Sequence, residues 1–254
     1  MLEVRDLTKR FRSVTVVDHV NFALHPGEIT GYLGPNGSGK STTVKMIVGL
    51  LNPSEGRVLF DGGDIRDDPV AFKRRLGYVP EEPHLYSYLT GLEYLQLAGR
   101  LRGMDSFLVD RKANHLLERF GLAEARWAPI SNYSKGMRQR ILIAAALLHD
   151  PDLFIFDEAQ SGLDIANAVL FRHLLQALAQ RGKTILYISH VLELVERICS
   201  RVIILYRGRV AADDSVAALR DLTKLPSLEE IFTQLAHHDD LELRAQDIAS
   251  LIAV

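Results

Sequence analysis

Apolar and polar residues alternate over much of the N-terminal quarter of the chain. Apolar side chains recur at strand-like spacing in 2–7 and again in 20–24. Such alternation is typical of half-buried β-strands. A Pro-Gly turn at 26–27 leads into an apolar run at 29–33, and 58–60 with the Asp-Gly pair that follows indicates a short strand pair. The pattern predicts an N-terminal antiparallel β subdomain.

The middle of the chain shows helical spacing instead. Thr90 and Glu93 form a capping box ahead of an apolar helical pattern, and a second helix is expected over 113–120. The stretch of about 85–148 therefore predicts a helical lobe inserted into an α/β core.

Short, wholly apolar runs mark the second half of the chain. The runs at 153–156 and 184–188 have the length of buried strands, and they flank a helical pattern at 165–180. A hairpin is expected at 202–211. We therefore expect one α/β domain over 1–215, with a mixed or parallel core sheet flanked by helices.

The remaining residues, 216–254, are predicted to form a C-terminal helical extension. Ser227 and Glu230 form a second capping box, and the apolar positions within 248–252 indicate an amphipathic helix that packs on the core or on a partner. This extension carries no catalytic constellation.

Composition changes this picture little. The chain has 254 residues, 47% of them hydrophobic and 24% charged, with a formal net charge of −2. There is therefore no bulk electrostatic case for a nucleic-acid partner. The single cysteine, Cys199, is expected to be a buried thiol. The longest clean apolar run, 141–148, is too short to span a bilayer. We expect a soluble, cytoplasmic chain whose role at a membrane needs a separate spanning partner.

The strongest chemical signal is the glycine-rich loop between the run at 29–33 and the helical pattern after it. Its sequence, GPNGSGKST, satisfies the phosphate-binding pattern G-x-x-x-x-G-K-[ST] in full. Backbone N–H groups at a helix N-terminus favour phosphate oxygens, the lysine reaches the β and γ phosphates, and the first hydroxyl ligates Mg²⁺. The predicted nucleotide-binding loop consists of Gly34, Pro35, Asn36, Gly37, Ser38, Gly39, Lys40, Ser41 and Thr42.

Two further strands end in polar residues. Asp157 and Glu158 follow the apolar run LFIF, where an aspartate can lie near Mg²⁺ and a glutamate can act as general base. His190 follows the strand at 184–188, at its C-terminal edge, and is placed to hydrogen-bond a γ-phosphate oxygen. Paired acids and lone histidines are more often structural, but here they end at the same sheet edge as the loop.

Other candidates stay open on the residues alone. Ser134, with Gly136, precedes an apolar helix and is either a second anion site or a plain helix cap. Phe11, flanked by basic residues, either stacks on a purine or is an ordinary exposed loop aromatic. Tyr86 and Tyr88 are expected in the core more than on a contact surface.

Together, the phosphate-binding loop, the YSKGM segment, the LFIFDE strand, the SGLD turn and His190 resemble the nucleotide-binding subunit of an ABC transporter. The resemblance covers 1 to about 215. It implies an ABC-type P-loop ATPase that binds ATP and Mg²⁺, pairs head to tail with a second ATP-binding subunit, and drives a transmembrane permease.

The resemblance also implies residue roles. Phe11 corresponds to the adenine-stacking aromatic, Ser134 and Gly136 to the signature loop that contacts the partner's ATP, and Asp164 to a residue acting across the interface. Glu81 corresponds to a glutamine that links the Mg²⁺ site to the helical lobe. Glu158 and His190 are then catalytic, and the metal ligands are Ser41, Glu81 and Asp157. The permease is expected near 81–89 and the lobe.

The chain departs from the family pattern at three places. Glu81 stands for glutamine, Lys135 and Met137 alter the signature, and Ala159-Gln160 replace a Pro-Thr pair. The glutamate, the YSKGM signature and the LEEIF segment are similar to exporters with a separately encoded permease, so export is favoured over uptake.

Two other functions are considered. One is a non-transport ABC protein acting on ribosomes or DNA, which would show salt-sensitive affinity for nucleic acid. The other is a regulatory switch that binds nucleotide with little turnover. The intact Lys40, Asp157, Glu158 and His190 argue against the switch.

Overall fold

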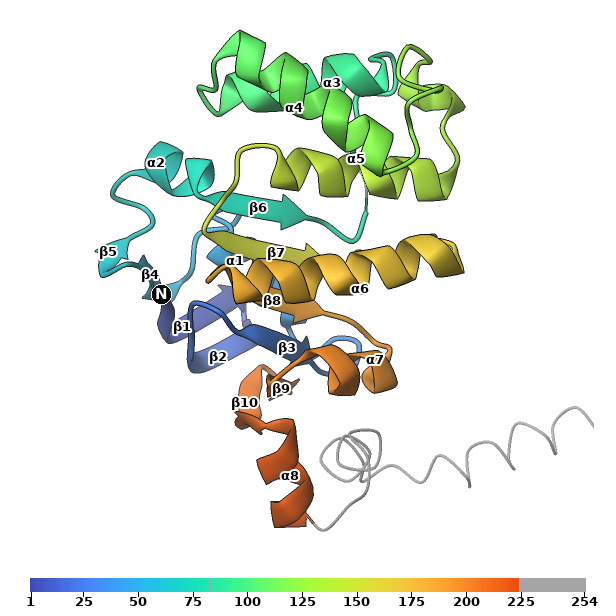
Figure 1. Cartoon of the computed structure of the whole chain (residues 1–254). Coiled ribbons are helices and arrows are strands. Elements are labelled where there is room, and N and C mark those ends of the chain that lie inside the picture. The colour runs from blue at the N-terminus through green and yellow to red at the C-terminus, as the bar shows by residue number, and fades with distance from the viewer. Residues whose placement is uncertain (83, 224–254) are drawn as a thin grey trace, which may run out of the picture.

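The computed structural model describes residues 1–82 and 84–223, which build two sheets with helices around them. Figure 1 shows the helical lobe stacked beyond one edge of the larger sheet, with the N-terminal sheet on the other side of the molecule. The expected positions 227, 230 and 248–252 lie outside the described residues.

The smaller sheet is antiparallel, as the alternating pattern predicts. Its strand order is β2-β1-β4-β5, and every pairing runs antiparallel. Leu2, Val4 and Leu7 of the first strand are all buried. The strands are β1 (Leu2–Phe11), β2 (Val14–Leu24), β4 (Glu55–Phe60) and β5 (Gly63–Asp64).

The larger sheet is parallel apart from one edge hairpin. Its order is β10-β9-β3-β8-β7-β6, and only β10 and β9 pair antiparallel. Every residue of β3, β7 and β8 is buried, because helices or the other sheet cover both faces. The strands are β3 (Ile29–Leu33), β6 (Leu76–Val79), β7 (Leu153–Asp157), β8 (Thr184–Ile188), β9 (Arg201–Tyr206) and β10 (Arg209–Ser215).

The helices carry the caps that the sequence predicts, but the start of one helix was predicted too late in the chain. Thr90 and Glu93 form the expected capping box of α3. The helix expected over 113–120 is longer: α4 begins at Ser106, where the Asp105 carboxylate caps it by accepting from the backbone N–H of Leu108. The helices are α1 (Lys40–Ile47), α2 (Pro69–Arg74), α3 (Gly91–Leu101), α4 (Ser106–Arg119), η1 (Ile130–Asn132), α5 (Lys135–Leu147), α6 (Ile165–Gln180), α7 (Leu192–Ile198) and α8 (Val216–Thr223).

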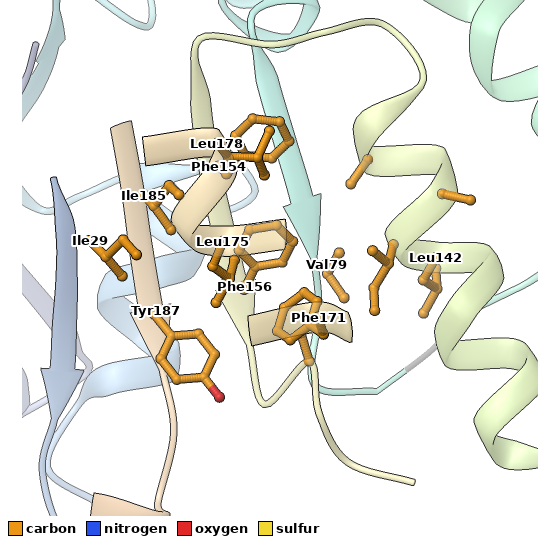
Figure 2. Packing of buried hydrophobic residues seen from close by; sticks show 14 of the residues in the cluster. Ile29, Val79, Leu142, Phe154, Phe156, Phe171, Leu175, Leu178, Ile185 and Tyr187 are labelled. Carbon is orange, nitrogen blue, oxygen red and sulfur yellow. The ribbon is translucent and has the colours of Figure 1, made fainter. Parts of the chain in front are cut away.

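The two faces of the larger sheet bury different cores. One face packs against α1 and the antiparallel sheet, and the other against α5, α6 and α7. On the second face, Phe154 stacks on Phe156, whose ring meets the edge of Phe171 with centroids 5.1 Å apart (Figure 2). This aromatic cluster anchors α6 over the strands that end in the polar residues.

The structure bears on two further expectations. Cys199 is buried and free, as expected. The preference for a core position is wrong for Tyr86 and Tyr88, whose exposed fractions are 53% and 75%. Backbone bonds such as that from the Ile130 N–H to the Leu89 carbonyl, 2.8 Å, tie this segment to the lobe without burying the rings. None of the helices in the described part of the chain is long and apolar enough to cross a membrane.

We expect Phe171→Ala to lower the free energy of unfolding by about 3–5 kcal/mol, because it removes a 1%-exposed ring and leaves a cavity. Chemical denaturation of the two proteins measures the loss. The neighbouring Leu170, 43% exposed on the same helix, is the matched control, and Leu170→Ala should cost far less. Equal losses would contradict the assignment of this core.

Candidate nucleotide-binding and catalytic site

The phosphate-binding loop connects β3 to the first residue of α1. Gly39 caps the helix in the left-handed conformation, with φ of 104°. A Cβ atom there would also lie 2.7 Å from the Val16 carbonyl oxygen, so both the backbone angle and the close approach require glycine. The expected strand-turn-helix context is therefore present, with the helix N-terminus open to an anion.

Two polar side chains of this loop point to phosphate chemistry. The Lys40 ammonium donates to the carbonyl oxygens of Gly34 and Pro35, at 2.6 and 3.1 Å. Burial lowers the pKa of Lys40, while Asp157 and the other nearby carboxylates act in the opposite direction. The Ser38 hydroxyl is buried and has no hydrogen-bond partner among the residues that the structure describes. A buried, unpaired hydroxyl beside a lysine suits a loop that receives phosphate oxygens.

The end of β7 concentrates negative charge. Asp157 is 6% exposed, and its pKa is raised to about 6, first by burial and then by Glu81 and Glu158. Glu158 follows with φ of 49°, and its N–H donates to the Ile188 carbonyl at 3.0 Å. This backbone bond holds the second carboxylate beside the end of β8.

His190 meets that carboxylate directly. Its Nδ1 lies 2.9 Å from Glu158 Oε2, and the pair is charged when the imidazole is protonated. The His190 side chain is 79% exposed, whereas that of Glu158 is 15% exposed. A half-buried carboxylate and an exposed imidazole thus lie together at the sheet edge expected for ligands.

A pocket of about 380 Å³ opens beside these groups, and we call it the metal pocket. It brings Ser41, Glu81 and Asp157 together, as the sequence predicts for metal ligands. The described residues contain no cluster of three or more His, Cys, Asp or Glu side chains that could hold a metal alone. Mg²⁺ binds instead through one or two carboxylates plus substrate phosphates and water, so this donor set fits it. The pocket is lined by Ser41, Lys45, Leu50, Tyr78, Pro80, Glu81, Glu82, His84 and Asp157.

The predicted signature loop lies at the start of α5. Ser134 caps this helix, with its hydroxyl accepting from the Met137 N–H at 3.2 Å. At Gly136, a Cβ atom would lie 2.6 Å from the Gly162 carbonyl oxygen, so this glycine permits close packing against the SGLD turn. Nothing in the part of the chain that the structure describes joins Ser134 to the phosphate-binding loop.

The SGLD turn ends at another helix cap. The Asp164 carboxylate accepts from the backbone N–H of Asn167 at 2.9 Å and caps α6. This bond, followed by that to the Asn167 side chain, lowers the pKa of Asp164. Asp164 is therefore an exposed, ionised cap within this chain.

Phe11 lies at the end of β1, opposite Val14. It is 47% exposed, with the Lys9 ammonium 5.2 Å from the ring centroid. The following strand then passes the phosphate-binding loop, since Val16 approaches Gly39. An exposed aromatic beside the nucleotide loop is compatible with stacking on a base.

The sequence reasoning missed Tyr78 and Lys45, which also line the metal pocket. Tyr78 lies in β6, two residues before Pro80, and Lys45 lies one helical turn after Ser41. The i, i+4 spacing from Ser41 to Lys45 was the available signal for the lysine. For Tyr78 the pairing of β6 with β7 is required, which the sequence does not state.

Comparison with known proteins decides the family. The family model described as ABC transporter matches residues 17–161. This chain belongs to the ABC transporter family. It is 37% identical to the ABC transporter ATP-binding protein NatA of Bacillus subtilis (strain 168) over 91% of this chain and 96% of that protein. It is 34% identical to the ABC-type transporter ATP-binding protein EcsA of the same organism, over 94% and 98%.

Solved structures agree with this assignment. The structure of an ATP-binding subunit of an ABC transporter matches with a TM-score of 0.88 and 34% identity, covering 92% of this chain and 99% of that one. The ATP-binding cassette MJ0796, solved as a dimer in a post-hydrolysis state with ADP and Pi, matches at 0.79 and 26%, covering 85% and 99%. The fold is thus the ABC ATPase cassette, and this chain is an ATPase, the ATP-binding subunit of an ABC transporter. Such subunits generally dimerise and pair with transmembrane subunits.

We expect Asp157→Asn to stabilise the protein in EDTA without nucleotide. Because folding raises the Asp157 pKa from 3.8 to about 6, the folded state binds the proton more tightly, so this carboxyl costs stability as pH rises through that interval. The full cost is up to about 3 kcal/mol above pH 6 and disappears below pH 4. Thermal unfolding of both proteins at pH 4 and pH 8 measures it.

The exposed Asp67 provides a control, since Asp67→Asn should leave the pH dependence unchanged. A stability gain for Asp157→Asn that is as large at pH 4 as at pH 8 would contradict the electrostatic cause.

Proposed function

We propose that this subunit powers export through a separately encoded transmembrane permease, using ATP-driven head-to-tail dimer closure. The observation that carries the hydrolytic part of this proposal is the meeting of Lys40, Asp157, Glu158 and His190 at one edge of the parallel sheet. Lys40 comes from the loop after β3, the two acids from the end of β7, and the histidine from the end of β8. This is the set of groups that phosphoryl transfer to water requires.

We assign ATP binding to the phosphate-binding loop. The N-terminal N–H groups of α1 and the Lys40 ammonium bind the phosphates, and on binding the ammonium exchanges its bonds to the Gly34 and Pro35 carbonyls for phosphate oxygens. Asn36, Gly37 and Thr42 complete the loop, and Phe11 stacks on the adenine. The buried Ser38 hydroxyl supports this role because it has no partner within the described chain.

Ser41, Asp157 and Glu81 would hold Mg²⁺ in the metal pocket. The cation would supply positive charge that offsets the charge of the phosphates and of the carboxylates that raise the Asp157 pKa. Glu81 is a carboxylate where the family usually has a glutamine, so it adds negative charge to this pocket and favours a cation there.

Glu158 acts as the general base toward the attacking water. Its backbone bond to Ile188 fixes its position, and its low exposure keeps the carboxylate from being fully solvated. His190 orients this carboxylate through the 2.9 Å contact and presents its other nitrogen to the γ-phosphate. Glu158 and His190 are therefore the proposed catalytic pair.

The second ATP-binding subunit completes each site. Ser134 and Gly136 are exposed or half-buried at a helix N-terminus and have no contact with this chain's own phosphate-binding loop in the described structure, so they are free to face a partner's nucleotide. Asp164 acts across the same interface. A two-fold axis makes each contact twice, and the MJ0796 cassette was solved as a dimer.

We infer that the permease docks on a second pocket, of about 340 Å³, between the end of α1, α2 and the end of α3. Of the surface expected from the sequence, this pocket includes part of the helical lobe but no residue of 81–89. We call it the lobe groove. Leu50, Val70 and Leu101 expose apolar side chains there at 64%, 60% and 72%. It is lined by Val48, Leu50, Val70, Lys73, Arg74, Leu76, Tyr78, Leu101 and Arg102. An apolar surface of this kind fits a protein partner, and it would place the subunit on the inner face of the plasma membrane.

Relatives support export as the direction. The matches include the linearmycin resistance ATP-binding protein LnrL of Bacillus subtilis, 37% identical over 84% of this chain, and the probable multidrug protein YbhF of Escherichia coli (strain K12), 34% identical over 95%. The first name states resistance to linearmycin and the second a probable multidrug transporter, and export of a drug is one way in which a transporter gives resistance.

The catalytic assignment is tested with two substitutions. Glu158→Gln should retain ATP binding and lower kcat by about 10²-fold or more, because only the base is removed. Lys40→Ala should instead weaken ATP binding. Steady-state ATPase assays and equilibrium binding of a fluorescent ATP analogue separate the two effects. Glu193→Gln, at an exposed position of α7, should leave both quantities unchanged. Equal loss of binding in Glu158→Gln and Lys40→Ala would contradict the assigned roles.

The dimer is tested with the Glu158→Gln protein, which cannot clear bound ATP. Light scattering should show a dimer with ATP and a monomer without it. Adding Gly136→Ala should weaken the dimer, because the new methyl group displaces the signature loop from the SGLD turn. Gly63→Ala is the matched control, since a Cβ atom there meets its nearest neighbour at 3.8 Å. An ATP-bound protein that never pairs with itself would rule out the homodimer.

A further inference from the structure

The metal pocket and the lobe groove are adjacent. Leu50 and Tyr78 are the two residues that line both of them. Leu50 offers only an exposed apolar side chain, whereas Tyr78 combines an aromatic ring with a polar hydroxyl. Tyr78 is therefore the residue with a polar group that lines both pockets.

Strand pairing places Tyr78 beside the metal ligands. Tyr78 is paired with Ile155 in the parallel β6–β7 register. Side chains alternate along a strand, so Asp157, two residues after Ile155, lies on the same face as Tyr78. That face is covered by α1, whose second residue is Ser41, and Tyr78 packs against the core on this side.

The charges around Tyr78 agree with this placement. Burial raises the pKa of the Tyr78 hydroxyl, and Asp157 and Glu81 raise it further. Both carboxylates line the same pocket as this phenol, and they are two of the three proposed metal ligands. A neutral hydroxyl near two carboxylates is a hydrogen-bond donor that can orient either of them, directly or through water.

We propose that Tyr78 is a positioning residue that couples occupation of the lobe groove to the carboxylates of the metal pocket. Its hydroxyl orients Asp157 and Glu81, and its ring is the wall against which a partner in the lobe groove presses. The inference rests on the proposed function, because it assumes that Mg²⁺ and ATP occupy the metal pocket. It adds a route by which a permease segment reaches the metal ligands.

The first test removes the Tyr78 hydroxyl and keeps the aromatic ring. Tyr78→Phe should weaken Mn²⁺ binding to the protein–ADP complex roughly tenfold, the range seen when outer-shell partners of metal ligands are changed. Electron paramagnetic resonance titration with Mn²⁺ measures this without turnover. In ATPase assays, the Mg²⁺ concentration for half-maximal rate should rise by a similar factor while kcat at saturating Mg²⁺ stays within about twofold. Tyr94→Phe, a tyrosine of the helical lobe that lines neither pocket, is the control.

The second test fills the lobe groove in place of a partner. Leu101→Trp should shift the Mn²⁺ affinity when Tyr78 is present and not in the Tyr78→Phe background, giving a non-additive double-mutant cycle. Leu170→Trp places the same side chain on α6, outside the lobe groove, and should have no effect in either background. Melting curves establish that each variant is folded.

The outcomes separate the two proposals. A wild-type protein that hydrolyses no ATP would overturn the proposed function. An active wild-type protein whose Mn²⁺ affinity is unchanged by Tyr78→Phe, or whose cycle with Leu101→Trp is additive, would overturn the assignment of Tyr78 alone.

Discussion

Parallel pairing of β3, β8 and β7 is the constraint on which the site depends. Parallel strands all end at the same edge, so chemistry separated by more than a hundred residues in sequence is brought to one place without long side chains. The strands hold this position because their side chains are buried on both faces, against two separate cores. This arrangement lowers the stability of the folded protein through electrostatic repulsion and burial of charge. Asp157 is held in a dry position near other carboxylates, and its raised pKa records that cost. This unfavourable energy is the kind that a bound cation would relieve in the proposed metal site.

The features that could be predicted from the sequence are those set by residues close together in the chain, and the features that were missed depend mostly on distant residues. The phosphate-binding loop, the capping box of α3 and the bounds of α6 rest on neighbouring residues, and the structure confirms their geometry. The start of α4 was missed because its cap, Asp105, is followed closely by three consecutive apolar residues, 107–109, which show no helical spacing by themselves. The exposure of Tyr86 and Tyr88 depends on backbone pairing with residues some forty positions later, which no local pattern reports. Tyr78 is invisible for the same reason, since its importance comes from the register of β6 on β7.

Some site residues are brought together within this chain, whereas others lie on its surface and are proposed to contact a partner's nucleotide. Lys40, Asp157, Glu158 and His190 are brought together within one chain. Ser134 and Asp164 are instead stabilised as helix caps, each bonded to its own helix. A cap keeps a polar residue well ordered at low cost, and this explains how a surface can be ready for a partner before the partner arrives.

The contact between Gly136 and the Gly162 carbonyl has a consequence for timing in the proposed dimer. Gly162 lies four residues after Glu158, so the turn that follows one subunit's own general base packs against the loop that the same subunit offers to the other nucleotide. Loss of the γ-phosphate at one site would therefore change the backbone position at the other site through this direct contact. The two ATP molecules would then be consumed cooperatively, and the turnover of one half would depend on the state of its twin.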